Sequence, residues 1–386
     1  MTNIKLYNKI SKIGLDVFDN TKYNVSEDAT PAEGILVRSA ALHEVEFDRE
    51  LLAIARAGAG VNNIPIDRCS EQGIVVFNTP GANANGVKEL AMAALLLASR
   101  DIVGGVNWAL GLKGQPEVGK LVEKGKSQFV GPEIKGKTLG VIGLGAIGGM
   151  VANTAHSLGM KVEGCDPYIT VKNALQLSRS VKLDESYDDI YANSDYITYH
   201  IPSLPSTRGI INKENIAKMK DGVRIINLSR GDLANTADLI EALESGKVAS
   251  YVTDFPSEEL LGVPHVVCIP HLGASTPESE DNCAVMAAEQ LIDYIENGNI
   301  RNSVNYPEIV FPRTTASRIL VLHDNVPNII TQISGALASD NVNIESLLSQ
   351  AKGNNAVSIF DSNDKIVDSV VADIAKIAGV VRVIVK

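Results

Sequence analysis

The segment from Thr138 to Pro167, TLGVIGLGAIGGMVANTAHSLGMKVEGCDP, constrains the fold more than any other part of the chain. An apolar, β-branched run is followed by Gly143, Gly145 and Gly148, which have the spacing GxGxxG. Apolar residues then recur at helical intervals, and a second short apolar run ends at Asp166. This order predicts a buried strand, a tight turn, a helix and a second parallel strand.

Each residue type in this segment suits a bound dinucleotide. The first glycine permits the tight turn, the second lets the backbone approach a pyrophosphate, and the third lets helix and strand pack closely. The N-terminus of the helix offers free amide groups and a positive dipole end to the pyrophosphate. Asp166 lies 23 positions after Gly143, where an acid binds the adenosine ribose and repels a 2′-phosphate, so NAD is favoured over NADP. A glycine-rich turn that binds nothing is the disfavoured alternative, because both strands, the helix and the acid are present.

Length, composition and charge limit the classes of protein to which the chain can belong. The chain has 386 residues, enough for two or three domains, and is 45% hydrophobic and 21% charged. No apolar run is long enough to cross a bilayer, and the N-terminal stretch lacks a hydrophobic core with a cleavage site, so we expect a cytoplasmic protein without membrane contact. A net charge of −11 argues against nucleic acid as a partner. Four cysteines, far apart and without a CxxC pair, predict neither disulfides nor a metal site.

The first 93 residues predict an α/β unit with an anion-binding edge. Apolar runs at 34–37 and 73–77 predict strands, and Arg38, Arg56 and Asn83 follow strand ends or lie in turns. Open α/β sheets bind ligands at the carboxyl ends of their strands, and two arginines there suggest an anionic substrate. For each arginine taken alone, an ordinary surface position is an equal alternative.

The alternation of strands and helices continues after Asp166. Short apolar runs end at or beside His200, Arg230, Asp254 and His271, so these side chains are expected at one edge of a parallel sheet, beside the dinucleotide crevice. Histidine is suited to proton exchange near neutral pH, and arginine binds carboxylates through a fork of donors. His271 alone is better interpreted as a capping or core histidine, but Arg230 and a downstream acid shift the preference to catalysis.

The C-terminal part has a different pattern. Residues 305–315 contain two prolines and no clear period, which predicts a linker. Residues 317–386 predict a split βαββαβ module of ferredoxin-like type. The fold is thus expected to be α/β, with two doubly wound Rossmann-like domains and a C-terminal ferredoxin-like module. We expect a discontinuous substrate-binding domain at 1–93 and 281–305, an NAD-binding domain at 94–280 and a third domain at 316–386.

Six stretches carry a resemblance to a known family: VRSA (37–40), RAGAGVNNI (56–64), NTPGANA (78–84), GLGAIG (143–148), NLSRGD (227–232) and PHLGAST (270–276). In this order the chain resembles the D-isomer-specific 2-hydroxyacid dehydrogenases, with a C-terminal ACT regulatory domain. Within the family it is similar to members that oxidise 3-phospho-D-glycerate to 3-phosphohydroxypyruvate with NAD, the first step of L-serine biosynthesis, under feedback inhibition by L-serine. The alternatives are a dehydrogenase of broader D-2-hydroxy acid range and, less favoured, a non-catalytic NAD-sensing regulator.

The resemblance implies a catalytic arginine, glutamate and histidine. Arg230 matches the arginine of the SRG motif and His271 the histidine of PHxG. The family pattern around the glutamate resembles DVFxxEP, and here the following proline is missing. Gapless alignment from Arg230 selects Glu259, which we prefer, whereas alignment on Phe-Pro selects Glu258. Asp254 then matches the aspartate that holds the nicotinamide carboxamide.

The resemblance also implies three sets of binding residues. NAD is expected at the glycine loop and the strand ends that follow it, namely Gly143, Gly145, Ala146, Ile147, Gly148, Asp166, Pro167, His200, Pro202, Thr207, Leu228, Ser229, Asp254 and Gly273. A phosphorylated 2-hydroxy acid is expected at Arg38, Ser39, Arg56, Gly58 and Asn83. L-serine, the expected effector, is assigned to His323, Asn325 and Asn343, for which turn and cap roles are the alternative. A helix at 89–98 that is apolar nearly all round, together with the ACT sheet edge, predicts a homo-oligomer, a dimer or a tetramer.

Overall fold

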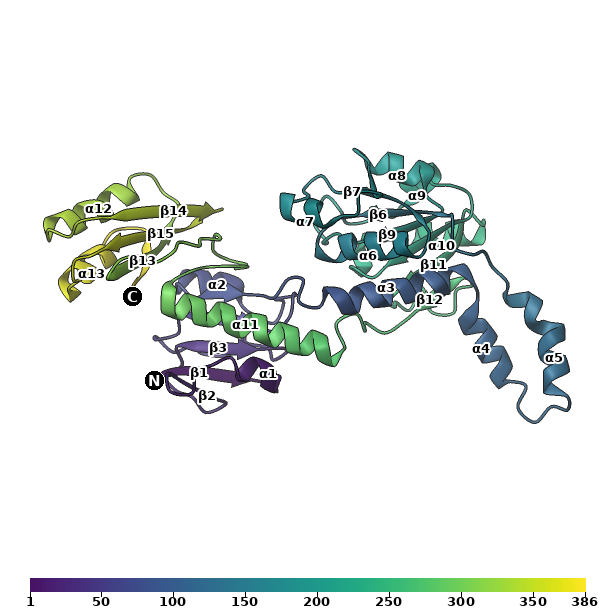
Figure 1. Cartoon of the computed structure of the whole chain (residues 1–386), viewed down its shortest axis with the longest axis horizontal. Coiled ribbons are helices and arrows are strands. Elements are labelled where there is room, and N and C mark those ends of the chain that lie inside the picture. Colours follow the sequence, from purple (N-terminus) through teal and green to yellow (C-terminus); the bar gives the residue numbers. More distant parts are fainter. The chain divides into compact units, whose positions relative to one another are not determined.

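The computed structural model describes all 386 residues and divides into two compact units (Figure 1). Unit 1 consists of Met1–Ala82 and Glu280–Lys386, and unit 2 of Asn83–Ser279. Helix α3 (Ala84–Ser99) lies entirely in unit 2, so the first division falls before this helix rather than at residue 93. The C-terminal module shares unit 1 with the N-terminal sheet. No helix combines the length and apolar character that crossing a membrane requires.

Unit 2 is built on a seven-stranded parallel sheet with the order β12-β11-β10-β9-β6-β7-β8. The two halves of the sheet run outward from the neighbours β6 and β9, which is the doubly wound arrangement predicted from the sequence. Its strands are β6 (Thr138–Ile142), β7 (Lys161–Cys165), β8 (Lys182–Leu183), β9 (Tyr196–Tyr199), β10 (Val223–Asn227), β11 (Val248–Thr253) and β12 (Val266–Cys268). Its helices after β6 are α6 (Ala146–Ser157), α7 (Val171–Gln176), α8 (Tyr187–Asn193), α9 (Lys213–Lys218), the 3-10 turn η2 (Gly231–Leu233) and α10 (Thr236–Glu244).

Separate apolar clusters cover the two faces of this sheet. Helices α8, α9 and α10 bury Ile190, Ile216 and Leu239 in one cluster, while α3 and α6 contribute to the other. Helix α3 is buried along the face that carries Ala91, whereas Leu96 on its other side is 39% exposed. Within the single chain, only one stripe of α3 therefore meets the sheet, and its other side stays open.

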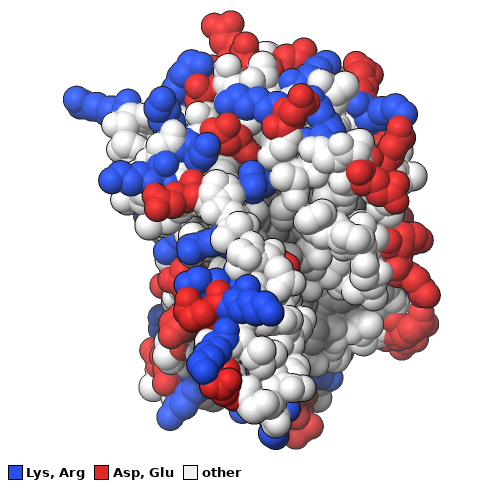
Figure 2. Space-filling model, turned by 90° about the vertical axis from the view of Figure 1, so that its right-hand side faces the viewer, with Lys and Arg blue, Asp and Glu red and all other residues white.

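A helical arm follows α3 in unit 2. It comprises α4 (Ile102–Leu110), α5 (Val118–Gly125) and the 3-10 turn η1 (Lys126–Phe129), and Figure 1 shows it projecting from the end of α3. Its apolar side chains are largely exposed, as for Val106 at 54%, Leu110 at 71% and Val118 at 41%. Figure 2 shows the face on the side of the arm, where uncharged surface occupies the middle and acidic side chains gather along one edge. The arm thus carries apolar surface that its own unit does not bury.

The N-terminal part of unit 1 is a five-stranded parallel sheet with the order β2-β1-β3-β4-β5, again doubly wound. Its strands are β1 (Thr2–Tyr7), β2 (Tyr23–Ser26), β3 (Gly34–Val37), β4 (Ala53–Arg56) and β5 (Val75–Phe77), with the short helices α1 (Lys12–Leu15) and α2 (Ile66–Glu71). Helix α11 (Pro277–Asn297), which enters unit 1 at Glu280, covers one face of the sheet and buries Ala287, Leu291 and Tyr294 there.

The C-terminal module is an antiparallel sheet with two helices on one face, in the predicted βαββαβ order. It comprises β13 (Ser317–Asp324), α12 (Ile329–Ser339), β14 (Ser346–Lys352), β15 (Asn355–Ser362), α13 (Asp368–Ala375) and β16 (Val380–Val385). The strand order β14-β15-β13-β16 is that of a ferredoxin-like fold. The predicted fold class is therefore confirmed for all three sheets.

The other face of the C-terminal sheet packs within unit 1. Leu320, Leu322 and Ile359 belong to the same apolar cluster as Leu291 and Tyr294 of α11. At this junction Arg318 is fully buried, and its Nε and Nη2 donate to Asp361 at 2.6 and 2.7 Å. Its Nη1 donates to the carbonyls of Asn297 and Phe311 at 2.9 and 2.8 Å. One guanidinium thus joins the module to the C-terminal end of α11.

The predicted linker at 305–315 is wrong for its first half. Asn305, Tyr306 and Ile309 are 6%, 1% and 2% exposed. The side-chain oxygen of Asn305 accepts from the Val76 amide at 2.9 Å, and its side-chain nitrogen donates to the Ile74 carbonyl at 2.9 Å, beside β5. This segment is therefore anchored to the N-terminal sheet, a contact that prolines and an absent period do not reveal.

Candidate active site

The glycine loop has the geometry that a pyrophosphate requires. Gly143 has φ +91°, and a Cβ there would collide with the His200 carbonyl. A Cβ on Gly148 would collide with the Gly143 carbonyl, so α6 approaches β6 only because this residue is glycine. At Gly145, the N-cap of α6, nothing lies within 4 Å of an added Cβ and no side chain caps the helix. The open space faces free amides at a helix N-terminus and fits a dinucleotide phosphate.

Asp166 follows β7 at the same edge of the sheet. One carboxylate oxygen accepts from the Leu144 amide at 2.9 Å, and the other accepts from the Tyr168 amide at 2.9 Å. The Asp166 side chain is thereby held beside the glycine loop, and each oxygen keeps a further lone pair for a ribose hydroxyl. Pro167 is exposed next to it.

The loop after β9 contributes a half-buried imidazole. His200 lies against Gly143 and Gly148, and its Nε2 is 3.0 Å from the Thr198 hydroxyl. Burial lowers the pKa of His200 to about 4, so its ring is neutral at pH 7. The turn that follows is closed by Thr207, whose hydroxyl donates to the Pro202 carbonyl at 2.6 Å. These contacts fix the shape of the crevice beside the glycine loop.

The turn after β10 is held by a residue that the sequence interpretation missed. Asn227 is fully buried, and its side-chain amide donates to the Arg230 carbonyl at 2.9 Å and to the Tyr251 hydroxyl at 3.2 Å. Its side-chain oxygen accepts from the Ser229 amide at 3.2 Å. The Ser229 hydroxyl donates to the Tyr199 carbonyl at 2.6 Å, which ties the turn to β9. The signal for Asn227 was its place as the first residue of NLSRGD, after an otherwise apolar strand.

Arg230, Asp254 and His271 come together at the carboxyl ends of β10, β11 and β12. Burial raises the pKa of the Asp254 carboxyl, and His271 and Arg230 oppose that rise through their charges. Arg230 and His271 are exposed, whereas Asp254 is 2% exposed and its Oδ1 has no hydrogen-bond partner. An orphaned buried oxygen of this kind suits a donor such as a carboxamide N–H. The edge of Phe255 meets the His271 ring at a centroid distance of 4.8 Å.

Neither glutamate that was considered for the acid role contacts the histidine. No hydrogen bond or ion pair joins His271 to Glu258 or Glu259, and both glutamates are exposed. The Ser257 hydroxyl lowers the pKa of Glu259. Glu259 lines a cavity of about 670 Å³ with Gly231 and Phe255, the residues that adjoin Arg230 and Asp254 in the chain.

The substrate residues expected in unit 1 lie around the end of β3 and β4. The Arg56 Nε donates to the Arg38 carbonyl at 3.0 Å, so the Arg56 side chain lies against the backbone of Arg38. Gly58, at φ +153°, leaves the space that the Arg56 guanidinium fills. The Ser39 amide donates to the Asn8 side chain at 3.0 Å. Asn83 lies in unit 2 as the N-cap of α3, without a side-chain capping bond.

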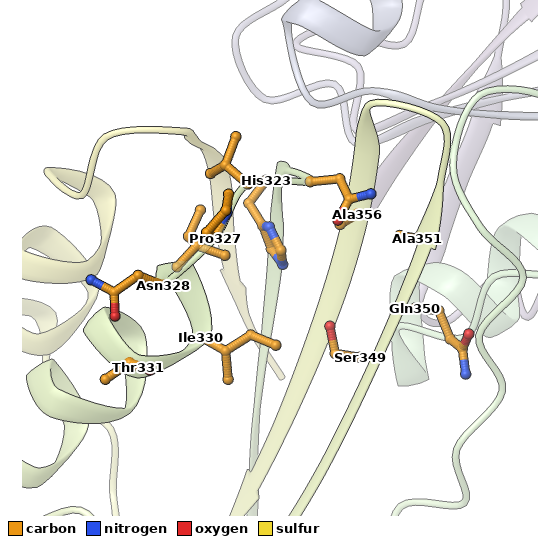
Figure 3. Close-up of a pocket in the computed structure, with 12 residues that line it drawn as sticks. His323, Pro327, Asn328, Ile330, Thr331, Ser349, Gln350, Ala351 and Ala356 are labelled. Carbon is orange, nitrogen blue, oxygen red and sulfur yellow. The ribbon is translucent and has the colours of Figure 1, made fainter.

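Two of the three expected effector residues line one pocket in the C-terminal module. His323 and Asn325 border a cavity of about 370 Å³, together with Asn328, Ser349 and Gln350, as Figure 3 shows for the labelled residues. His323 is 3% exposed, and its Nε2 lies 2.8 Å from the Ser358 hydroxyl. Asn343 is not among the lining residues; it precedes β14, and its side chain donates to Glu345 at 3.0 Å. The structure therefore brings His323 and Asn325 together within one chain and places Asn343 apart.

Comparison with known proteins defines the class. Residues 93–273 match the family described as D-isomer specific 2-hydroxyacid dehydrogenase, NAD binding domain. Residues 93–273 are therefore an NAD-binding domain of the D-isomer-specific 2-hydroxyacid dehydrogenase type, and the similarity of the rest of the chain rests on particular relatives. The resemblance inferred from the six sequence stretches is thus confirmed.

Particular relatives extend the comparison beyond that domain. The chain is 37% identical over 314 residues to a D-3-phosphoglycerate dehydrogenase of Archaeoglobus fulgidus, covering 77% of this chain and 56% of the relative. It is 32% identical over 317 residues to one of Bacillus subtilis, covering 80% and 58%. The structure of an NAD⁺-bound 3-phosphoglycerate dehydrogenase of Entamoeba histolytica aligns with TM-score 0.61 and 26% identity over 79% of this chain and 98% of that one. The chain thus spans a little over half the length of these two sequence relatives.

Proposed function

We propose that the protein is an NAD-dependent D-3-phosphoglycerate dehydrogenase, which oxidises 3-phospho-D-glycerate to 3-phosphohydroxypyruvate as the first step of L-serine biosynthesis. The observation that carries the proposal is the meeting of Arg230, Asp254 and His271 at three strand ends of an NAD-binding domain. Relatives of that name, at 32% and 37% identity, support the choice of substrate.

The roles follow from the chemistry of each side chain. A bound nicotinamide exchanges a hydride with C2 of the substrate. His271 accepts the hydroxyl proton during oxidation, because imidazole titrates near neutral pH. Arg230 binds the substrate carboxylate, and Asp254 accepts from the cofactor carboxamide. Glu259 is assigned to orient the His271 ring, a role that needs a movement of its loop from the position described here.

Steady-state kinetics with phosphohydroxypyruvate and NADH test the assignment. We expect wild-type turnover, and we expect H271A to lose most of kcat, roughly a hundredfold or more, while it still binds NADH. H265A is the matched control, because His265 is a loop histidine before β12 that belongs to none of the proposed sites. Near-wild-type kcat for H271A would remove His271 from proton transfer. Absence of turnover on phosphohydroxypyruvate, with turnover on another 2-oxo acid, would reject the substrate.

A broader 2-hydroxyacid dehydrogenase is the second candidate. One observation favours it, since Arg38, an arginine assigned to the substrate phosphate, is already paired with the carboxylate of Glu280. Comparing kcat/KM for phosphohydroxypyruvate, hydroxypyruvate and glyoxylate separates the two candidates. A non-catalytic NAD-sensing regulator would bind NADH and reduce none of them.

Two further assignments accompany the enzyme proposal. We infer that L-serine binds the pocket at His323 and Asn325, whose polar groups and adjoining α12 N-terminus suit an amino acid. Stabilisation by L-serine but not glycine in a thermal-shift assay, lost in H323A, is the expected result.

We also infer a homo-oligomer, at least a dimer, through the exposed apolar residues of the arm. L110D should lower the molar mass measured by light scattering.

A further inference from the structure

Helix α11 presents a carboxylate to the arginine at the end of β3. The Arg38 Nη2 lies 2.5 Å from the Glu280 Oε1, and the two side chains are 43% and 42% exposed. Glu280 is the fourth residue of α11, a helix that is otherwise anchored to the sheet by its apolar face. The position of this carboxylate is therefore set by the fold of unit 1 rather than by a mobile loop.

The neighbouring arginine has no acid of its own. The Arg56 side chain takes part in no ion pair, and its only hydrogen bond is the one from Nε to the Arg38 carbonyl. Burial lowers the pKa of Arg56, and the positive charge of Arg38 acts in the same direction. Of the two guanidinium groups, Arg38 is thus paired with a carboxylate and Arg56 is not, so the positive charge of Arg56 is left for an incoming anion.

We propose that Glu280 is a specificity-determining residue, an internal counterion that an anionic substrate group must displace from Arg38. The inference rests on the proposed function, because it takes Arg38 and Arg56 to bind the substrate phosphate. Once displaced, the Glu280 carboxylate remains close to the phosphate and repels it. Glu280 therefore weakens binding of phosphorylated 2-hydroxy acids and has little effect on analogues that lack the phosphate. Glu280 thereby reduces the selectivity of the enzyme for phosphorylated over unphosphorylated 2-hydroxy acids.

The variant E280Q tests this role because it removes the charge and keeps the size of the side chain. A half-exposed ion pair contributes modestly, so we expect KM for phosphohydroxypyruvate to fall roughly threefold to fivefold. KM for hydroxypyruvate should stay within about twofold of wild type, since no phosphate is present to be repelled. The matched control is E278Q, because Glu278 is exposed in the same helix and makes no ion pair.

Several outcomes overturn the proposal. A higher KM for phosphohydroxypyruvate in E280Q would mean that Glu280 positions Arg38 for the substrate instead of competing with it. Equal falls in both KM values, or the same shift in E278Q, would mean a general charge effect. In the R38Q background, E280Q should still lower KM for phosphohydroxypyruvate, because the carboxylate repels a phosphate held by Arg56 directly; an unchanged KM there would contradict the repulsion.

A binding measurement separates failure of this inference from failure of the proposed function. Calorimetric titration with inorganic phosphate requires no turnover, and we expect E280Q to bind phosphate roughly threefold to fivefold more tightly than wild type. If wild type reduces no 2-oxo acid but E280Q binds phosphate more tightly, the proposed function fails and the counterion role stands. Unchanged or weaker phosphate binding by E280Q overturns the counterion role whatever the enzyme reduces.

Discussion

The buried ion pair between Arg318 and Asp361 gives the sharpest test of how the C-terminal module is held to the rest of unit 1. The two residues face each other across β13 and β15, and their side chains are 0% and 1% exposed. The variant D361N removes the negative charge and leaves the guanidinium buried with only neutral acceptors, the new amide oxygen and the carbonyls of Asn297 and Phe311. Breaking one side of such a pair costs about 3–5 kcal/mol, because a charge stays desolvated without a counterion.

Removing both charges should cost less than removing one. The double variant R318M/D361L leaves no buried charge, so the larger part of the loss should be regained. It still leaves the Asn297 and Phe311 carbonyls without their donor, at about 1–3 kcal/mol for each group that water does not reach. We therefore expect the double variant to lie between wild type and D361N in stability.

Hydrogen exchange followed by mass spectrometry is the suitable assay, because the single tryptophan, Trp108, lies in unit 2 and does not report on the module. Exchange of peptides from β13 and β15 should accelerate roughly a hundredfold to a few thousandfold in D361N. D373N is the matched control, since Asp373 forms an exposed pair with Lys376 in the same module, at 54% and 74% exposure, and such a pair contributes about 0–1 kcal/mol. Acceleration in D361N no greater than in D373N would refute the reasoning.

Three further predictions concern the NAD-binding domain. G145A should fold with unchanged stability but bind NADH weakly, because its methyl group enters open space at the start of α6. G148A should lose about 1–3 kcal/mol of unfolding free energy in urea denaturation, because its methyl group meets the Gly143 carbonyl. Burial lowers the pKa of His200 from 6.5 to about 4, so between these values the unfolded chain binds the extra proton and stability falls as pH falls; H200Q should flatten this part of the stability profile. N227A should lose about 1–3 kcal/mol and lower kcat more than it raises the Kd for NADH, because the buried amide shapes the turn that carries the arginine. Wild-type kcat in N227A would remove it from that role.

The sequence predicted those parts of the fold that depend only on residues close to one another in the chain. The glycine spacing, the strand before it and the acid after it predicted the loop at Gly143 and the place of Asp166, since each needs only its neighbours in sequence. Contacts between distant segments had no such signal. Asn305 was assigned to a linker because its partners at Ile74 and Val76 are over 200 residues away. Likewise, nothing near Arg318 in the sequence marks Asp361 as its partner.

The same distinction separates the features of the candidate site that the sequence predicted from those that it did not. Parallel strands bring their carboxyl ends to one edge, so the strand ends alone were enough to predict that Arg230, Asp254 and His271 meet. Topology does not set the conformation of a connection, however, and the choice between Glu258 and Glu259 depends on the connection from β11 to β12. Nor does it reveal which charges already have partners: Arg38 and Arg56 look alike in sequence, and only the structure shows a carboxylate on the first of them. Changing the charge at position 280 therefore tests how far this asymmetry contributes to the proposed selection of a phosphorylated substrate.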